Sequence, residues 1–359
     1  MARPAKDIDL VLHIGLHKTA STYLQNVLSA RRYDLIPYGV LYPSTGTYTA
    51  TALRTREGAQ SGHAHFSSRQ VRRGLVPALA NEMPPNATTV LLSSEDFSHP
   101  RNDPEQYLPI LSRFASVKVV LVLRRQDVWL ESLYKQEVDQ YFTRETRAFG
   151  EFLAEEGPGL IDFHTRFTPW RELVGADNFH VLSYDDLADG TEITRRVLRV
   201  AGVDADDLGE FPGIEVPRYE SVRAVDTVGL RVLNSMEMAS REARDALARE
   251  IYKAAPEGDF TLLTPEMREG IQARCASINE RIEAEWFDEP VPGLRFGKEI
   301  ATKATEPPSG TEMAEYLDRV LALCKAARDE QAEAAAEAAD SATPAGQAAG
   351  TGKAAGNAR

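Results

Sequence analysis

The chain has 359 residues and a net charge of −13, and 43% of its residues are hydrophobic. This length allows one large domain or two smaller ones, and the apolar content is sufficient for a packed core. The acidic balance argues against nucleic acid as a partner, because nucleic-acid-binding proteins usually carry an extended basic surface. A single anionic nucleotide remains compatible, since a few local cations can reverse the field within one cleft.

Neither a disulfide framework nor a membrane span is expected. The two cysteines, Cys275 and Cys324, lie at helical spacing within apolar stripes, which predicts two buried thiols and fits a reducing, cytoplasmic location. No apolar run approaches the roughly 18–20 residues that cross a bilayer. The first apolar stretch is short and lacks a small-residue cleavage site, so we interpret it as a strand rather than a signal peptide.

Short apolar runs predict buried strands, and each of the longer ones is followed by a helical pattern. The runs cover residues 8–16, 88–93, 117–123 and 179–183, and a shorter piece over 39–42 can add an edge strand. Near-continuous apolar strands that alternate with helices indicate a parallel sheet covered on both faces. The sequence therefore predicts an α/β fold whose parallel sheet has about four to five strands flanked by helices.

The second half of the chain is expected to be mostly helical. Together with the α/β part, a helical subregion over about 205–327 is predicted to form a single domain that spans residues 1–327. The composition then becomes rich in Ala, Glu and Gly and contains no aromatic residue. We expect residues 328–359 to be a largely disordered tail whose first part can extend the preceding helix.

A possible anion site follows the first strand, where a loop leads directly into a helix. Such a turn presents free backbone N–H groups, and the helix dipole adds about half a positive charge, so the sequence predicts a phosphate or sulfate site. Lys18 adds a full charge, and three hydroxyl side chains add donors. The alternative is an ordinary connection in which Lys18 lies in solvent. The loop consists of Gly15, Leu16, His17, Lys18, Thr19, Ala20, Ser21 and Thr22.

This loop departs from the Walker A pattern, which places a glycine directly before the lysine. It resembles instead the loop with which sulfotransferases bind their donor, 3'-phosphoadenosine 5'-phosphosulfate (PAPS), which reads roughly P-K-[ST]-G-[ST]-[ST]. His17 and Ala20 replace the proline and the glycine of that pattern. A positive φ at Ala20 would cost about 1–2 kcal/mol. The matching positions are Lys18, Thr19, Ser21 and Thr22.

A second motif lies at the end of the third long strand. Arg124 ends this strand, and Ser132 follows eight residues later. Sulfotransferases carry an arginine and a serine with this spacing, and these residues hold the 3'-phosphate of PAPS by charge-assisted contacts. The alternative is a surface arginine and a solvated serine. With weaker similarities around Trp170 and residues 183–187, the resemblance covers roughly residues 9–290. It implies a sulfotransferase fold of the P-loop-NTPase-like type, closest to bacterial members.

The resemblance implies transfer of a sulfuryl group from PAPS to an acceptor hydroxyl or amine, with no metal required. Lys18 is then expected to neutralise the leaving oxygen. In the family a glutamate or histidine just after the second long strand removes the acceptor proton, and Glu95 fits this position. Alternatively, Glu95 caps the helix that follows, and the rival bases are His17, His63, His65 and His99.

Three further expectations complete the interpretation. The resemblance implies a donor contact from Arg218. Residues 43–73 are expected to shape the acceptor pocket, and their mix of aromatic and histidine side chains suits a carbohydrate or a lipid-linked glycan. His13 faces the core and is expected to be a buried histidine with satisfied hydrogen bonds. The competing functions are a P-loop kinase that uses ATP and a non-catalytic, nucleotide-binding scaffold protein.

Overall fold

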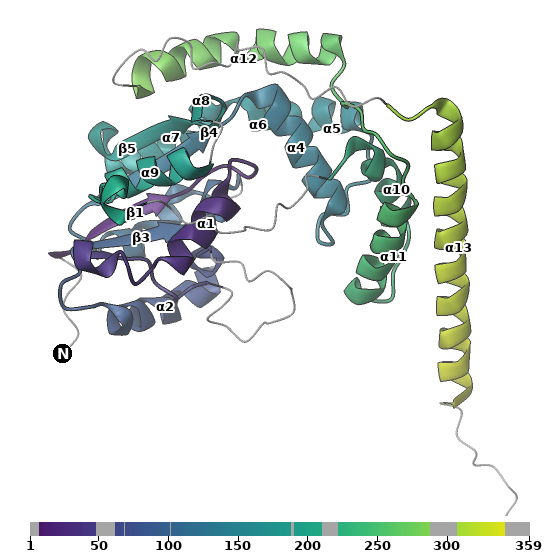
Figure 1. Cartoon of the computed structure of the whole chain (residues 1–359), viewed down its shortest axis with the longest axis horizontal. Helices are drawn as coiled ribbons and strands as arrows, with labels where there is room; N and C mark the ends of the chain where they lie inside the picture. Colours follow the sequence, from purple (N-terminus) through teal and green to yellow (C-terminus); the bar gives the residue numbers. More distant parts are fainter. Residues whose placement is uncertain are drawn as a thin grey trace, which may run out of the picture. The chain divides into compact units, whose positions relative to one another are not determined.

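The computed structural model describes residues 7–47, 62–67, 69–100, 102–187, 190–209, 222–287 and 307–341. The chain divides into two compact units (Figure 1). The sheet unit comprises residues 1–136, 147–221 and 261–304, and the helical unit comprises residues 137–146, 222–260 and 305–359. Each unit is described by itself, and a single domain over 1–327 remains a prediction.

The sheet unit contains five parallel strands in the order β2–β3–β1–β4–β5, which confirms the predicted α/β class. The predicted strands 117–123 and 179–183 have the predicted bounds, whereas the first strand ends at residue 13 because Gly15, with φ of 39°, turns the chain out of the extended conformation. The strands are β1 (Asp9–His13), β2 (Val40–Leu41), β3 (Thr89–Ser93), β4 (Val117–Leu123) and β5 (Phe179–Ser183).

The register of the sheet brings the carboxyl ends of three strands together. At the end of β1, His13 pairs with Ser93 on one side and with Val120 on the other. Ligands of open parallel sheets bind outside the carboxyl ends of the strands. The loop after β1 and the residues after β3 and β4 therefore share one edge, which is the edge where the predicted site residues lie.

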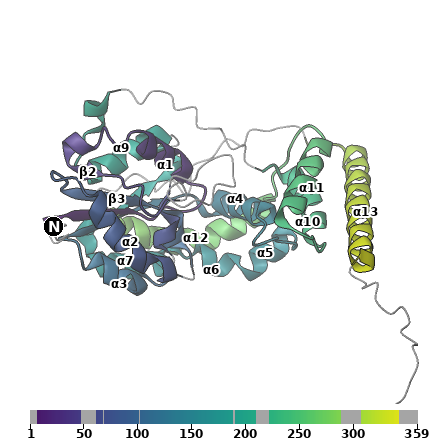
Figure 2. The same cartoon turned by 90° about the horizontal axis from the view of Figure 1, so that it is seen from below.

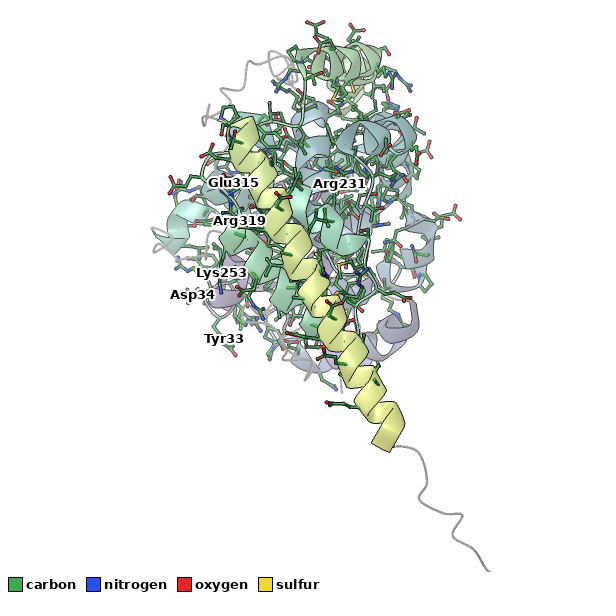
Figure 3. The ribbon with its side chains drawn as sticks, turned by 90° about the vertical axis from the view of Figure 1, so that its right-hand side faces the viewer. Tyr33, Asp34, Arg231, Lys253, Glu315 and Arg319 are labelled. Atoms are coloured by element: carbon green, nitrogen blue, oxygen red, sulfur yellow. The ribbon has the colours of Figure 1, made fainter. Side chains whose placement is uncertain are left out.

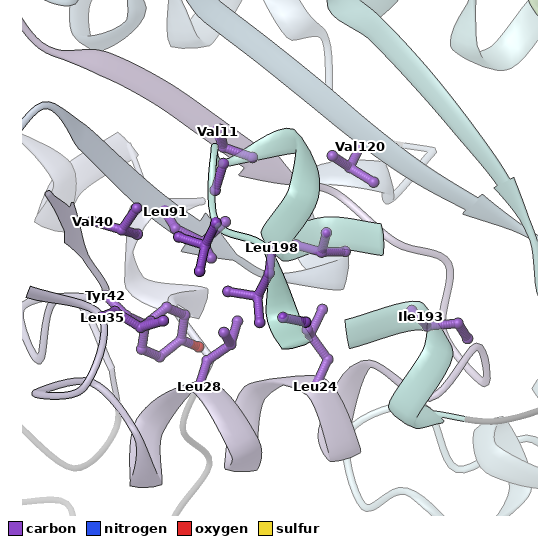
Figure 4. Close-up of a cluster of buried hydrophobic side chains, with 14 of the residues drawn as sticks. Val11, Leu24, Leu28, Leu35, Val40, Tyr42, Leu91, Val120, Ile193 and Leu198 are labelled. Atoms are coloured by element: carbon purple, nitrogen blue, oxygen red, sulfur yellow. The ribbon is translucent and has the colours of Figure 1, made fainter. Parts of the chain in front are cut away.

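Helices cover both faces of the sheet (Figure 2). One face packs on α1 (Ser21–Ala30) and α9 (Gly190–Val200) around a buried apolar cluster that includes Leu24, Leu28 and Leu198 (Figure 4). The helices on the opposite face in Figure 2 are α2 (Arg69–Glu82), α3 (Leu108–Leu111) and α7 (Phe163–Val174). Two covered faces explain why the strands are apolar on both sides.

The remaining helices of the sheet unit are short, apart from two. The longer ones are α4 (Gln126–Asp139), which continues into the helical unit, and α12 (Pro265–Trp286). The shorter α-helices are α5 (Phe149–Glu155), α6 (Gly157–Ile161) and α8 (Tyr184–Leu187). The 3-10 helices are η2 (Ile36–Tyr38), η3 (Ala64–Phe66), η4 (Glu95–Ser98), η5 (Pro104–Tyr107), η6 (Ala176–Asn178) and η7 (Ala205–Leu208).

The helical unit is built from α10 (Ala224–Asn234), α11 (Arg241–Ala254) and α13 (Gly310–Ser341). The Asn234 amide donates to the carbonyl oxygens of Val138 and Glu145, which fixes the end of α10. Glu315 and Arg319 are exposed on α13 (Figure 3). The start of the predicted tail, residues 328–341, belongs to α13, and residues 342–359 lie outside the described residues.

The two cysteines are buried free thiols, as predicted, with Cys275 on α12 and Cys324 on α13. Among the described residues, no helix combines the length and the apolar character that a bilayer span requires.

A close approach of helices at Gly229 generates the first prediction. A Cβ atom built on Gly229 would clash with the Tyr316 hydroxyl of α13 and would lie 2.8 Å from Cγ2 of Ile251. We expect Gly229→Ala to destabilise the helical unit by about 1–3 kcal/mol, since overpacking outweighs the gain in helix propensity. Urea denaturation followed by circular dichroism measures the change.

The matched control is Gly270→Ala on α12, where an added Cβ atom would meet nothing within 4 Å. This variant is expected to gain up to about 1 kcal/mol, because alanine favours a helix over glycine. Equal stability of the two variants would contradict the close approach at Gly229.

Candidate functional site

The loop between β1 and α1 has an unusual backbone. Three of its residues have positive φ angles, which are 39° at Gly15, 64° at Lys18 and 60° at Ala20. Left-handed residues that flank a residue of ordinary φ turn neighbouring N–H groups toward one side, and such concave arrangements bind anions. Ala20 therefore has the positive φ whose cost was considered above, because glycine stands at this position in the sulfotransferase pattern.

Ala20 is also the residue that precedes the first turn of α1, and it provides no side-chain cap. The first N–H groups of a helix have no partner inside the helix. These donors, together with the positive end of the helix dipole, therefore remain for an anion. The loop has the backbone geometry that an anion site requires, and binding of an anion there stays a prediction.

The hydroxyl groups of the loop have different roles. Thr19 is fully buried, and its hydroxyl donates to the Leu16 carbonyl oxygen at 2.7 Å and accepts from the Leu16 N–H at 3.3 Å. The Ser21 hydroxyl lies 3.4 Å from the same carbonyl oxygen. Thr22 is exposed in the first turn of α1. Thr19 and Ser21 thus hold the loop in shape, and Thr22 is the hydroxyl that faces solvent.

The second motif meets the loop directly. Arg124 Nη1 donates to the Lys18 carbonyl oxygen at 3.0 Å and to the Ser132 hydroxyl at 3.3 Å. The guanidinium lies over the ring of Tyr184, 4.9 Å from its centroid. Arg124 Nε is buried and has no hydrogen-bond partner among the described residues. The structure therefore brings Lys18, Arg124 and Ser132 together from three places in the chain.

Three residues that sequence reasoning did not assign to the site stabilise this arrangement. Trp129 Nε1 donates to the carbonyl oxygen of His17 at 3.0 Å. Tyr184 and Asp185 follow β5, and a carboxylate oxygen of Asp185 accepts from the backbone N–H of Arg125 at 2.5 Å. Burial raises the pKa of Asp185, while this hydrogen bond and the nearby arginines oppose the shift. The similarity to sulfotransferases over residues 183–187 was the signal in the sequence for Tyr184 and Asp185.

The proposed base lies just beyond β3. Glu95 is partly buried and begins η4, which Ser94 caps by accepting from the Asp96 N–H at 3.2 Å. Glu95 Oε2 accepts from Gln25 Nε2 of α1 at 2.8 Å. Ser94 therefore takes the capping role that the sequence analysis left open for Glu95.

Asp96 marks an electrostatic cluster at this edge. Burial raises the pKa of Asp96, the negative charge of Glu95 raises it further, and the nearby imidazoles of His17 and His65 oppose the shift. The predicted residues Glu95, His17 and His65 thus interact electrostatically with Asp96. Repulsion between two neighbouring carboxylates favours a cationic or hydrogen-bond-donating ligand beside them.

His63 is enclosed by backbone groups. The ring is fully buried, Nε2 donates to the Pro43 carbonyl oxygen at 2.9 Å, and Nδ1 accepts from the Ser93 N–H at 3.1 Å. Burial lowers the pKa of His63 to about 4. Since both ring nitrogens are engaged, this geometry argues against the catalytic role predicted for His63. The two hydrogen bonds instead hold the end of β3 against the chain at Pro43.

His65 is held differently and keeps its ring near Asp96. Its N–H donates to the carbonyl oxygen of Gly46 at 3.2 Å, so residues on either side of 48–61 are joined by backbone. His99 follows η4, and its N–H donates to the Asp96 carbonyl oxygen at 3.2 Å. Of the rival bases, His17 and His65 are therefore the two that interact electrostatically with Asp96, and both remain candidates for proton transfer.

His13 differs from its expectation. Its Nδ1 lies 2.8 Å from the Ser93 hydroxyl, but Nε2 is buried without a hydrogen-bond partner among the described residues. The ring lies beneath the loop, since a Cβ atom built on Gly15 would lie 3.2 Å from Nε2. Burial lowers the pKa of His13 to about 4. The expected satisfied histidine is thus only half satisfied.

Two remaining expectations cannot be followed into the structure. Arg218, Tyr48 and part of the segment 43–73 lie outside the described residues. Over the described ranges, no group of three or more His, Cys, Asp or Glu side chains could hold a metal ion. A reaction without a metal remains a prediction.

Comparisons with known proteins give distant similarities. No protein-family model matches the chain. An uncharacterized protein from Archaeoglobus fulgidus is 26% identical over 174 residues, so the match spans about half of each chain, 47% of this one and 46% of that one. The crystal structure of a sulfotransferase from Alicyclobacillus acidocaldarius covers 79% of this chain and 96% of its own, with 16% identity and a TM-score of 0.41. At that TM-score the similarity carries no argument about function.

The positive φ of Ala20 generates the second prediction. Ala20→Gly is expected to leave stability unchanged or to raise it by up to about 1 kcal/mol, because relief of the left-handed strain offsets the flexibility that glycine adds to the unfolded chain. Thermal denaturation measures the change. The control Ala273→Gly, at an exposed position inside α12, is expected to lose about 1 kcal/mol. A loss of the same size at Ala20 would contradict the strain.

The buried histidines generate the third prediction. The pKa of His63 falls from 6.5 to about 4 on folding, so the unfolded chain binds protons more readily. The contribution of the neutral His63 ring to the free energy of unfolding is therefore complete above about pH 6.5. As the pH falls toward 4, the free energy of unfolding decreases by up to about 3 kcal/mol. Urea denaturation at several pH values should show a weaker pH dependence for His63→Gln than for the wild type, and equal slopes would contradict the neutral, buried imidazole.

Proposed function

We propose that the chain is a sulfotransferase that transfers a sulfuryl group from PAPS to an acceptor hydroxyl or amine. The observation that carries this proposal is the contact of Arg124 with both Ser132 and the Lys18 carbonyl oxygen. An anion loop alone suits any nucleotide phosphate. A further cation and hydroxyl beside the loop, here Arg124 and Ser132, suit a nucleotide that carries a second phosphate group, such as the 3'-phosphate of PAPS.

The charges of the reaction match the residues that are available. As the acceptor oxygen bonds to sulfur, the bond from sulfur to the phosphate oxygen breaks and adenosine 3',5'-bisphosphate leaves. Lys18 and the N–H groups of the loop stabilise the charge that develops on the leaving oxygen. Glu95 takes the proton that the acceptor loses, and His65 is the second candidate for this role.

The acceptor and the cellular location of the reaction are part of the same proposal. The carboxylates of Glu95 and Asp96 and the ring of His65 favour an acceptor rich in hydroxyl groups, and a carbohydrate or a lipid-linked glycan meets this requirement. We place the reaction in the cytoplasm, where the free thiols of Cys275 and Cys324 stay reduced.

Donor specificity provides the fourth prediction. Adenosine 3',5'-bisphosphate should raise the melting temperature much more than AMP does, because only the former carries the 3'-phosphate. Arg124→Ala should remove most of this difference, whereas Arg199→Ala, an exposed arginine on α9, should keep it. Stabilisation by ATP with Mg²⁺ equal to or above that by the bisphosphate would favour a kinase instead.

Turnover provides the fifth prediction. Lys18→Ala should lower kcat by at least about 10²-fold, as expected when a group that stabilises developing charge is removed. Glu95→Gln should lower kcat by about 10²–10⁴-fold, as expected for a general base, and should leave the affinity for adenosine 3',5'-bisphosphate unchanged. Assays with labelled PAPS and a panel of acceptors measure both effects. A wild-type rate in Glu95→Gln would move the role of base to His65.

A further inference from the structure

A buried glutamine links the anion loop to the proposed base. Gln25 lies on α1, one helical turn after Ser21, and only 5% of its surface is exposed. Its Nε2 atom donates to Glu95 Oε2 at 2.8 Å and to the Ser93 hydroxyl at 3.3 Å. The mechanism described above does not use Gln25, although it contacts the carboxylate that is proposed to take the proton.

The orientation of the Gln25 amide follows from its partners. A carboxylate oxygen can only accept a hydrogen bond, so the atom 2.8 Å from Glu95 must be the NH₂ group. The backbone of Gly62 covers the amide, since a Cβ atom built on Gly62 would lie 2.6 Å from both Cδ and Oε1 of Gln25. The amide is therefore confined between η4 and the Gly62 backbone, and it cannot rotate freely.

A chain of hydrogen bonds continues from Gln25 into the core. The Ser93 hydroxyl accepts the second N–H of Gln25 and lies 2.8 Å from Nδ1 of His13. His13 is fully buried, and burial lowers the pKa of its ring to about 4, so the ring is neutral. Ser93 thus accepts one N–H of the Gln25 amide while Glu95 accepts the other.

We propose that Gln25 is a positioning residue that holds Oε2 of Glu95 and leaves Oε1 for the acceptor hydroxyl. This inference rests on the proposed function, in which Glu95 is the general base. Gln25 also ties the proposed base to α1, the helix whose N-terminus is proposed to face the donor.

Other ionisable groups face Glu95 from the surrounding elements. Asp96 on η4, His13 on β1 and Tyr42 after β2 each interact electrostatically with Glu95. His13 is neutral, and burial raises the pKa of Tyr42 strongly, so Tyr42 is neutral as well. Asp96 is the remaining acid that interacts with Glu95, and the N–H group that Gln25 donates to Glu95 offsets part of their mutual repulsion.

The test uses Gln25→Met, which keeps the length and the volume of the side chain and removes its N–H groups. In the transferase assay, kcat should fall by about 10-fold or more, since misplacement of a base is costly. The affinity for adenosine 3',5'-bisphosphate should not change. Ser29→Ala, which removes a hydroxyl from the same helix, should match the wild type.

Two further measurements separate positioning from a general loss of structure. In the Glu95→Gln background, Gln25→Met should have no additional effect on kcat, because the residue acts through Glu95. The ¹³C chemical shift of the Glu95 carboxyl group, measured by NMR at neutral pH, should differ between Gln25→Met and the wild type, because the carboxylate loses the hydrogen bond from Gln25.

The NMR measurement decides the inference even if the wild type transfers no sulfuryl group. A wild type without turnover but with a changed Glu95 carboxyl shift in Gln25→Met would overturn the proposed function and keep the positioning of Glu95 by Gln25. An unchanged carboxyl shift, or additive losses in the double variant, would overturn the role of Gln25.

Discussion

The hydrogen bond from Arg124 to the Lys18 carbonyl oxygen is the contact on which the site depends. Lys18 and Ala20 are non-glycine residues with left-handed backbones, and each such residue persists only where its surroundings hold it. Arg124 and Trp129 donate hydrogen bonds to the carbonyl oxygens of Lys18 and His17. Within the loop, the Thr19 hydroxyl donates to the Leu16 carbonyl oxygen. The loop is therefore shaped before a ligand arrives, so that binding does not have to order it.

The sheet explains why residues that are distant in sequence can act together. Parallel pairing of β1 with β3 and β4 places the ends of these strands side by side. The loop after β1 is the predicted anion site, Arg124 follows β4, and Glu95 follows β3. Because α1 begins at the loop and carries Gln25 one turn later, a single helix reaches both the loop and the proposed base.

Local sequence patterns predicted the parts of the molecule that depend on local spacing. The apolar runs predicted the strands. The spacing of Arg124 and Ser132 implied that both meet one phosphate, and their hydrogen bond is compatible with that prediction. The anion site in the loop after β1 stays a prediction. Contacts of high sequence separation were not accessible to this reasoning. Gln25 meets Glu95 across 70 positions, and His63 meets Ser93 across 30. No periodicity encodes such pairs, and His63 was therefore given a catalytic role that its two backbone partners argue against.

The backbone bond between His65 and Gly46 has a consequence for how this scaffold can diversify. It closes a stem, and the His63 ring fastens that stem to the end of β3 through Pro43 and Ser93. The stem therefore joins the chain after β2 to the end of β3 by backbone groups and one imidazole. Related scaffolds that keep these contacts can vary elsewhere while the end of β3, two residues before Glu95, stays in place.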